Sequence, residues 1–381
     1  MAKSGARRKR GGLIQIGKLD LTFLSFVLIL VTIGLVMLFS ASYAYSYARF
    51  NNSYHFIVRQ AIFAVVGVVI MFALSRVDVK VYRKMAIPLY VVSIALLVLV
   101  LALPPMVKGM EHKRWLVLGP ITFQPSEIAK FAIITLFAHL IAKYHKRMDK
   151  FKFVMTLLLL LAGVCGLVVI ETHLSATILI LLIGVVLMIV GGLAVKYIVM
   201  GAGVAVGAVI LVVVTGVVDY ASSRFTYWLD PWADASGSGY QTIQSLLAIG
   251  SGGLLGRGIG QSRQKYLWVP EPHNDFIFSI VCEELGLIGA MIIIGLFCAL
   301  VWRGFTIAMR AKDRFGTFMA IGLTFQVGLQ AILNILVVTN TMPNTGISLP
   351  FFSYGGTALV ILLAEMGVVL SVSRGSSVKK L

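Results

Sequence analysis

Charged residues are scarce in this sequence. Asp, Glu, Lys and Arg together make up 13% of its 381 residues, whereas hydrophobic residues make up 59%. An ordinary soluble domain carries about 25% charged residues, so the composition excludes that class of protein. Cysteine is also rare, and Cys165, Cys282 and Cys298 lie inside apolar blocks without metal-like spacing. A disulfide framework is therefore not expected.

A cleavable signal peptide is missing as well. The basic run Arg7-Arg8-Lys9-Arg10 precedes an apolar block that is too long for the core of a signal peptide and lacks a small-residue cleavage site. We therefore expect this block to be retained as a membrane span, behind a basic cytoplasmic tail at residues 1–20.

The sequence does contain many apolar blocks long enough to cross a bilayer. They predict an all-α polytopic membrane protein with about ten transmembrane helices. The expected spans are residues 21–42, 56–74, 86–103, 126–142, 153–170, 174–192, 197–217, 275–302, 315–338 and 351–372. Residues 21–372 then form one membrane domain, 373–381 a short cytoplasmic tail, and 218–274 one large loop between the seventh and eighth spans.

The formal net charge of +18 fits membrane topology better than nucleic-acid binding. Most Lys and Arg residues lie in short polar intervals between apolar blocks, where they orient a membrane protein with its basic loops inside. This distribution places both termini in the cytoplasm and the loop 218–274 outside the membrane. No nucleic-acid partner is expected.

Asp275 is the sharpest candidate for chemistry. It follows the stiff segment Pro270-Glu271-Pro272 and immediately precedes an apolar span, so it lies near the membrane–water boundary. A helix N-terminus favours the ionised carboxylate, whereas burial opposes it. The alternative is that Asp275 merely caps the helix, a common role for Asp at such a position.

Glu127 and Lys130 lie three residues apart at the outer start of the fourth span, where Ser126 is the expected N-cap. Ionisable residues in a span favour a functional interpretation. A structural ion pair between helices is the alternative. Glu283, Glu284 and Glu365 pose the same choice, because such acids could form a proton path or could pair with basic partners.

A glycine run at residues 250–260 includes Arg257. Two more basic residues, Arg263 and Lys265, follow it closely. It does not match the nucleotide-binding fingerprints, because no Gly-Lys-Ser/Thr follows and no strand–helix unit surrounds it. The segment could bind an anionic head group. Tight backbone packing at the bilayer edge is the alternative.

Several motifs in fixed order resemble one known family. They are GYQTIQSLLAIGSGG at 239–253, GIGQSRQK at 258–265, PEPHNDFIF at 270–278 and EELG at 283–286, supported by Arg114-Trp115, by QPSE at 124–127 with Lys130, and by PFFSYGG at 350–356. Together they resemble the shape, elongation, division and sporulation (SEDS) family, and the similarity covers nearly the whole chain. The match is closest to the FtsW/SpoVE division branch rather than to RodA.

The resemblance implies a peptidoglycan glycosyltransferase that polymerises lipid II outside the bacterial cytoplasmic membrane, at the division septum. Class B penicillin-binding protein transpeptidases, other division proteins and membrane lipid are the implied partners. The family's catalytic aspartate falls on Asp275, although Asn274 replaces the usual Thr. The residues expected to bind substrate are Glu127, Lys130, Arg114, Trp115, Arg224, Gln244, Arg257, Arg263, Lys265, His273 and Ser353. A divalent cation, Mg²⁺ or Mn²⁺, could help, but no dedicated metal site is visible.

One motif departs from the family. Many members read Gln-Pro-Asp-Leu-Gly where this chain has Glu171-Thr172-His173-Leu174-Ser175, so no family role carries over to His173. Two other functions stay open: a flippase that moves lipid II outward, and a non-catalytic scaffold of the division machinery. The span count and the intramembrane acids would suit a transporter.

Overall fold

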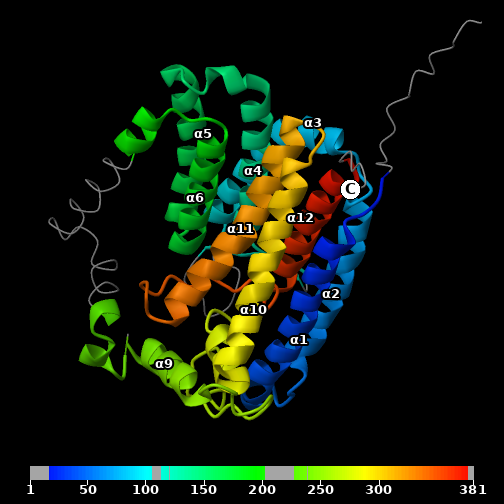
Figure 1. Cartoon of the computed structure of the whole chain (residues 1–381). Helices are drawn as coiled ribbons and strands as arrows, with labels where there is room; N and C mark the ends of the chain where they lie inside the picture. The colour runs from blue at the N-terminus through cyan, green and yellow to red at the C-terminus, as the bar shows by residue number, and fades with distance from the viewer. Residues whose placement is uncertain (1–16, 105–112, 120, 202–226, 238, 376–381) are drawn as a thin grey trace, which may run out of the picture.

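The structure is a computed structural model that describes residues 17–104, 113–119, 121–201, 227–237 and 239–375. Within these ranges the fold is helical apart from one short hairpin, in agreement with the predicted all-α class. The helices are α1 (Leu21–Phe50), α2 (His55–Leu74), α3 (Val79–Ala102), α4 (Pro125–Tyr144), α5 (Phe151–Ile170), α6 (Leu174–Val190), α9 (Tyr240–Gly252), α10 (Ile277–Met309), α11 (Arg314–Val338) and α12 (Gly356–Gly375), with short 3-10 turns at His145–Arg147 and Pro231–Asp234. Figure 1 shows the long helices as one bundle with α9 lying across one end.

Nine of the ten expected spans have a counterpart among the described residues. Eight helices are long and apolar enough to cross a membrane, and α6 is a shorter apolar helix of 17 residues. The remaining expected span, 197–217, falls mostly on 202–226, which lie outside the described residues. The hairpin of β1 (Leu116–Leu118) and β2 (Ile121–Phe123) was not predicted, because three-residue strands leave too short a pattern to detect.

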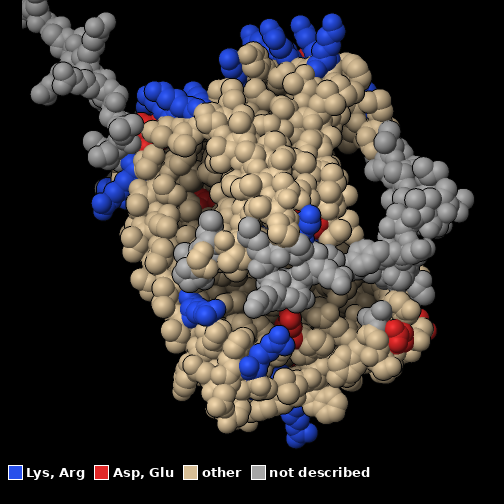
Figure 2. All heavy atoms as spheres, turned by 180° about the vertical axis from the view of Figure 1, so that it is seen from behind, with Lys and Arg blue, Asp and Glu red and all other residues tan. Residues whose placement is uncertain are grey.

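The two ends of the described chain meet at one end of the bundle. The amide of Asp20 donates to Ser373 Oγ at 3.3 Å, and Arg374 donates to the Gly17 carbonyl at 3.3 Å. This agrees with an even number of spans. Figure 2 shows Lys and Arg gathered at the upper end of the bundle, the end that carries the termini in Figure 1. That distribution supports a cytoplasmic position for this end.

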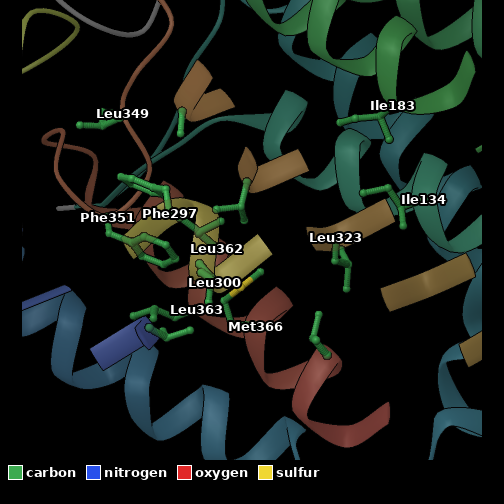
Figure 3. Packing of buried hydrophobic residues seen from close by; sticks show 14 of the residues in the cluster. Ile134, Ile183, Phe297, Leu300, Leu323, Leu349, Phe351, Leu362, Leu363 and Met366 are labelled. Carbon is green, nitrogen blue, oxygen red and sulfur yellow. The ribbon is translucent and has the colours of Figure 1, made fainter. Parts of the chain in front are cut away.

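The helices α4, α11 and α12 form the centre of the bundle, and about two thirds of each apolar window is buried. Close approach there depends on small residues: a Cβ added at Gly322 of α11 would lie 2.6 Å from Ile134 of α4. Ile183, Leu323 and Met366 bring α6, α11 and α12 into the same hydrophobic cluster (Figure 3). This rigid centre carries the outer loops that build the cavity described below.

Helix α10 is broken at Gly286, which has φ 67° and ψ −170°. The break frees backbone groups on both sides, and the polar loop satisfies them. The amides of Arg257 and Gly258 donate to the carbonyls of Glu283 and Glu284, each at 3.0 Å. Two amides of α10, just past the break, donate in turn to the carbonyls of residues 253 and 254 at 2.9 and 3.1 Å. Because unpaired backbone groups are costly within a membrane, this loop is a structural part of the helix.

Tight packing explains the glycine run beside this break. A Cβ added at Gly286 would lie 2.3 Å from the Gly256 nitrogen, and one added at Gly256 would lie 2.2 Å from the Glu284 carbonyl oxygen. No side chain fits between the two segments. Of the two interpretations of the glycine run, the structure supports backbone packing.

Candidate active site

A cavity of about 440 Å³ lies at the end of the bundle opposite the termini and collects the outer segments predicted to matter. It is bordered by α2, α4, α6, α12, β2 and the loop 346–355. Its ionisable lining residues are Arg59, Arg114, Glu127, Lys130, His173 and Asp275. They come from separate parts of the chain, so only the tertiary fold brings them together.

Asp275 lies in a turn that precedes α10, and its carboxyl group lines the cavity. The N-cap of α10 is Phe276, without a side-chain capping bond, so the interpretation of Asp275 as a helix cap is wrong. Among the described residues no hydrogen bond is made to its carboxylate oxygens. Gly346, at φ 71°, leaves space for them: a Cβ added there would lie 3.2 Å from Asp275 Oδ2. The carboxylate is therefore available to a ligand.

Burial, with a smaller contribution from the nearby charge of Glu271, raises the pKa of Asp275 to about 6 against the opposing effect of Arg114. Of the two opposing effects considered from the sequence, burial therefore outweighs the helix N-terminus, and the pKa of Asp275 is raised. A carboxylate with this pKa is mostly ionised at pH 7 and is still basic enough to take a proton. These are the properties that a general base needs.

The main chain of Asp275 is held by Asn334 of α11. The Asn334 side-chain amide donates to the Asp275 carbonyl at 2.7 Å and to the Ile347 carbonyl at 2.6 Å. Asn334 is completely buried. It therefore fixes the turn that carries Asp275 against the loop that contains Gly346. A lone Asn in an apolar helix was the available sequence signal, but its partner could not be known.

Glu127 and Lys130 form an ion pair at 2.9 Å within the wall of the cavity. Lys130 is 2% exposed, and its partner is 16% exposed. The N-cap of α4 is Gln124, so the expected capping role of Ser126 is wrong. The pair lies within α4, so the interpretation as an ion pair between helices is wrong, and both residues line the cavity.

Arg114 and Trp115 also line the cavity. The Arg114 Nε donates to the Glu171 carbonyl at 3.2 Å, which ties the start of the hairpin to the turn between α5 and α6. Arg59, in the outermost turns of α2, is a cavity residue that the sequence analysis missed. An Arg one turn inside an otherwise apolar span was the signal that could have found it.

Ser353 and His273 support the cavity in different ways. Ser353 Oγ donates to the Asn274 carbonyl at 2.8 Å and accepts from the Leu349 amide at 2.7 Å, so it positions the residue next to Asp275. The His273 ring is buried outside the cavity lining, with centroid distances of 4.3 Å to Phe56 and 4.8 Å to Tyr45. Burial lowers its pKa to about 4, so it is neutral at pH 7.

Lys265 and Arg257, two basic residues of the long loop, are absent from the cavity lining. Lys265 Nζ lies 3.0 Å from Glu284 Oε1 and 3.0 Å from Ser40 Oγ, and the Lys265 side chain is 3% exposed. Arg257 Nε lies 3.7 Å from Glu283 Oε1. These contacts confirm that the two acids pair with basic partners. They also correct the expectation that Lys265 and Arg257 meet the substrate beside Asp275.

Two further predicted residues are absent from the lining of this cavity. The Arg263 amide donates to Glu283 Oε1 at 2.9 Å, and the residue is absent from the lining. Gln244 is buried on α9, away from Asp275. Arg224 lies outside the described residues. In the part of the chain that is described, no group of three or more His, Cys, Asp or Glu side chains is arranged to hold a metal ion.

The comparison with known families decides the identity of this fold. Residues 20–378 match the model of the FtsW/RodA/SpoVE cell cycle proteins. The chain belongs to that family. Stage V sporulation protein E of Bacillus subtilis (strain 168) is 38% identical over 94% of this chain and 97% of its own. A probable peptidoglycan glycosyltransferase FtsW of Geobacter sp. (strain M18) is 38% identical over 93% and 96% of the two chains.

Solved structures of family members share the fold. A chain from a peptidoglycan synthase complex that coordinates polymerization and crosslinking matches with a TM-score of 0.79 and 29% identity, over 93% of this chain and 98% of that one. RodA, the rod shape determining protein of Thermus thermophilus, matches with a TM-score of 0.70 and 27% identity, over 95% and 98%. These matches confirm the SEDS resemblance and the polytopic helical architecture.

Proposed function

We propose that this protein is a peptidoglycan glycosyltransferase that polymerises lipid II into β-1,4-linked glycan strands. The observation that carries the proposal is the Asp275 carboxylate, which faces a cavity lined by three cationic side chains at the end of the bundle opposite the termini. Two relatives named probable peptidoglycan glycosyltransferase FtsW support it, and this chain matches 96% and 93% of their length. A site at the edge of the bundle suits a substrate whose lipid tail stays in the bilayer.

In the proposed reaction Asp275 acts as general base. Its carboxylate takes the proton from the 4-hydroxyl of the acceptor GlcNAc while that oxygen bonds to C1 of the donor MurNAc. The bond from C1 to the pyrophosphate oxygen breaks, the configuration at C1 inverts, and undecaprenyl pyrophosphate leaves with the bonding electrons. General-base assistance of this kind contributes roughly 10²–10⁴-fold to the rate.

The cations of the cavity supply the electrostatic part of the mechanism. Negative charge develops on the pyrophosphate as it leaves, and fixed positive groups stabilise that charge in a site of low dielectric. Arg59 and Arg114 line the same cavity as Asp275 and are the residues we assign to this work, whereas the charge of Lys130 is balanced by Glu127 at 2.9 Å. They replace Arg257 and Lys265, whose charges are used by Glu283 and Glu284. The described residues offer no three-ligand metal set, so no step is assigned to a divalent cation.

The rate of polymerisation should fall on acidification through the pKa of Asp275. Because the base must be ionised and its pKa is about 6, we expect kcat/KM to drop about tenfold per pH unit below that value. His173, with a pKa of about 3, stays mostly neutral down to pH 4, and His273, with a pKa of about 4, takes up a proton only near that lower limit. Glu171, whose pKa burial raises to about 8, provides a control: Glu171→Gln should leave the acid limb in place. An unchanged rate between pH 7 and pH 4 would contradict the role of Asp275.

Replacing Asn334 by Leu should lower kcat more than it raises KM. The substitution removes the donor that holds the Asp275 carbonyl, and a displaced catalytic group costs on the order of 10–10²-fold in rate. Gln330→Leu is the matched control, because Gln330 lies one turn away on α11 and holds Ser348 in the same loop without contacting Asp275. Equal losses of kcat in the two variants, in steady-state assays, would argue against a specific positioning role for Asn334.

Purified protein in liposomes separates this function from its alternatives. With lipid II on the accessible leaflet, polymer formation supports the glycosyltransferase. Transfer of lipid II across the bilayer without polymer formation would identify a flippase instead. If the protein shows neither activity, the scaffold function is favoured.

We further propose a penicillin-binding transpeptidase as partner, because a similar chain forms part of a peptidoglycan synthase complex. The basic end of the bundle would face the cytoplasm, and the cavity the outer face of the membrane at the division septum. The assay should therefore be run with and without a class B penicillin-binding protein.

A further inference from the structure

His173 lines the cavity but has no part in the mechanism above. It is the N-cap residue of α6, and it makes no capping bond with its side chain. The start of α6 lies close to the base: a Cβ added at Gly346 would be 3.2 Å from Asp275 Oδ2 and 3.9 Å from Ser175 Oγ. His173, Ser175 and Asp275 all line this one cavity.

One nitrogen of the ring is already used by the protein. Nδ1 of His173 lies 3.1 Å from Gln124 Nε2 and 3.5 Å from Ser126 Oγ. A side-chain amide nitrogen only donates hydrogen bonds, so Nδ1 is the acceptor and the single proton of the neutral ring is on Nε2. Among the described residues no acceptor is bonded to Nε2. The Nε2–H group of His173 is therefore on the side of the ring opposite Gln124 and Ser126 and can donate to a ligand in the cavity.

The ring is held in its neutral form. Burial, together with the positive charges of Arg114 and Lys130, lowers the pKa of His173 to about 3. A neutral N–H donor is suited to a neutral oxygen, such as a hydroxyl or an N-acetyl carbonyl. The charged phosphates of the substrate would instead pair with the cationic side chains that line the same cavity.

We infer that His173 is a substrate-binding residue whose Nε2–H donates a hydrogen bond to a neutral oxygen of the lipid-linked sugar. This inference rests on the proposed function and adds to it a contact that recognises the sugar rather than the pyrophosphate. The Gln124 amide is then a positioning group, because it selects the tautomer that presents the donor.

Binding of two lipids distinguishes this role from a structural one. The parent is the Asp275→Asn variant, so that lipid II is bound and not consumed. Removing one neutral hydrogen bond should weaken lipid II binding by about 3- to 10-fold in His173→Phe. His173→Gln places an amide N–H near the position of Nε2 and should bind nearly as well as the parent. Undecaprenyl pyrophosphate, which has no sugar, should bind equally to all three proteins.

Gln124→Glu supplies a second test at pH 8. A carboxylate accepts from Nδ1–H, moves the proton of the ring away from Nε2 and turns the cavity-facing atom into an acceptor, so lipid II should bind roughly tenfold more weakly. The tautomer can be read directly from ¹⁵N chemical shifts of labelled histidine. The His173 side chain makes no capping bond to α6, so we expect its variants to keep the thermal stability of the parent. Gln124 is 7% exposed, so thermal unfolding of Gln124→Glu controls for the burial of its new carboxylate.

Two results would overturn the inference while leaving the proposed function intact. The first is undiminished lipid II binding in both His173→Phe and Gln124→Glu. The second is an equal loss for lipid II and for undecaprenyl pyrophosphate, which would show that the ring supports the phosphate site or the fold. A parent protein that binds no lipid II would instead overturn the proposed function, and the inference with it.

Discussion

Asp275→Asn should abolish most of the polymerisation of lipid II, with a loss of roughly 10²–10⁴-fold in kcat. Asn has nearly the same shape as Asp but cannot take a proton, so the variant removes the base without opening a cavity. The carbonyl of residue 275 should still accept from Asn334, because that bond involves the main chain. The measurement is the rate of glycan formation from purified lipid II, together with the affinity for lipid II, which should change little.

Asp275→Glu is the companion variant. It keeps a carboxyl group, but the extra methylene moves that group away from the position of the Asp275 carboxylate, so we expect a partial loss. Thermal unfolding of both variants controls for folding. Polymerisation at the wild-type rate by folded Asp275→Asn protein would remove this residue from the mechanism, whatever the family suggests.

Lys265→Met should lower the stability of the protein more than any other substitution of a charged loop residue. It leaves Glu284 buried without its cation, and breaking a buried ion pair from one side costs about 3–5 kcal/mol. Ser40 would still donate to the carboxylate at 2.7 Å, but a neutral hydroxyl does not balance the charge. The free energy of unfolding in bicelles is the quantity to measure.

The double variant Lys265→Met with Glu284→Gln should recover much of this loss, because it removes both buried charges. Arg83→Met is the matched control, since Arg83 pairs with Asp313 on the surface and both side chains are at least 40% exposed. An exposed pair contributes about 0–1 kcal/mol. A Lys265→Met variant no less stable than Arg83→Met would show that the loop is not anchored through this pair.

These experiments separate two kinds of charged residue that the sequence presents alike. Glu127 and Lys130 lie within the cavity wall, whereas Lys265 and Glu284 lie in the joint between the loop and the broken helix α10. Both pairs combine Lys with Glu, and in both the Lys side chain is buried. Only their position relative to Asp275 assigns one pair to the site and the other to the fold.

The sequence by itself determined the class of protein and most of the spans, and it singled out Asp275, the residue to which we assign the role of base. Runs of about 20 apolar residues can satisfy their backbone groups in a membrane only as helices, so the spans are a local property. Asp275 was found for a related reason, since a carboxylate at the lip of an apolar span is visible without knowing its neighbours. The family motifs then gave this position a chemical role.

The tertiary structure decided which residues share the cavity. Arg59 and Asn334 were missed, and Arg257 and Lys265 were placed in the site by their charge, because a sequence shows that a side chain is charged but not which partner neutralises it. Partners here come from helices far apart in the chain, and hydrogen bonds and ion pairs act only over a few ångströms. Which charges meet the substrate is therefore fixed by the packing of the bundle.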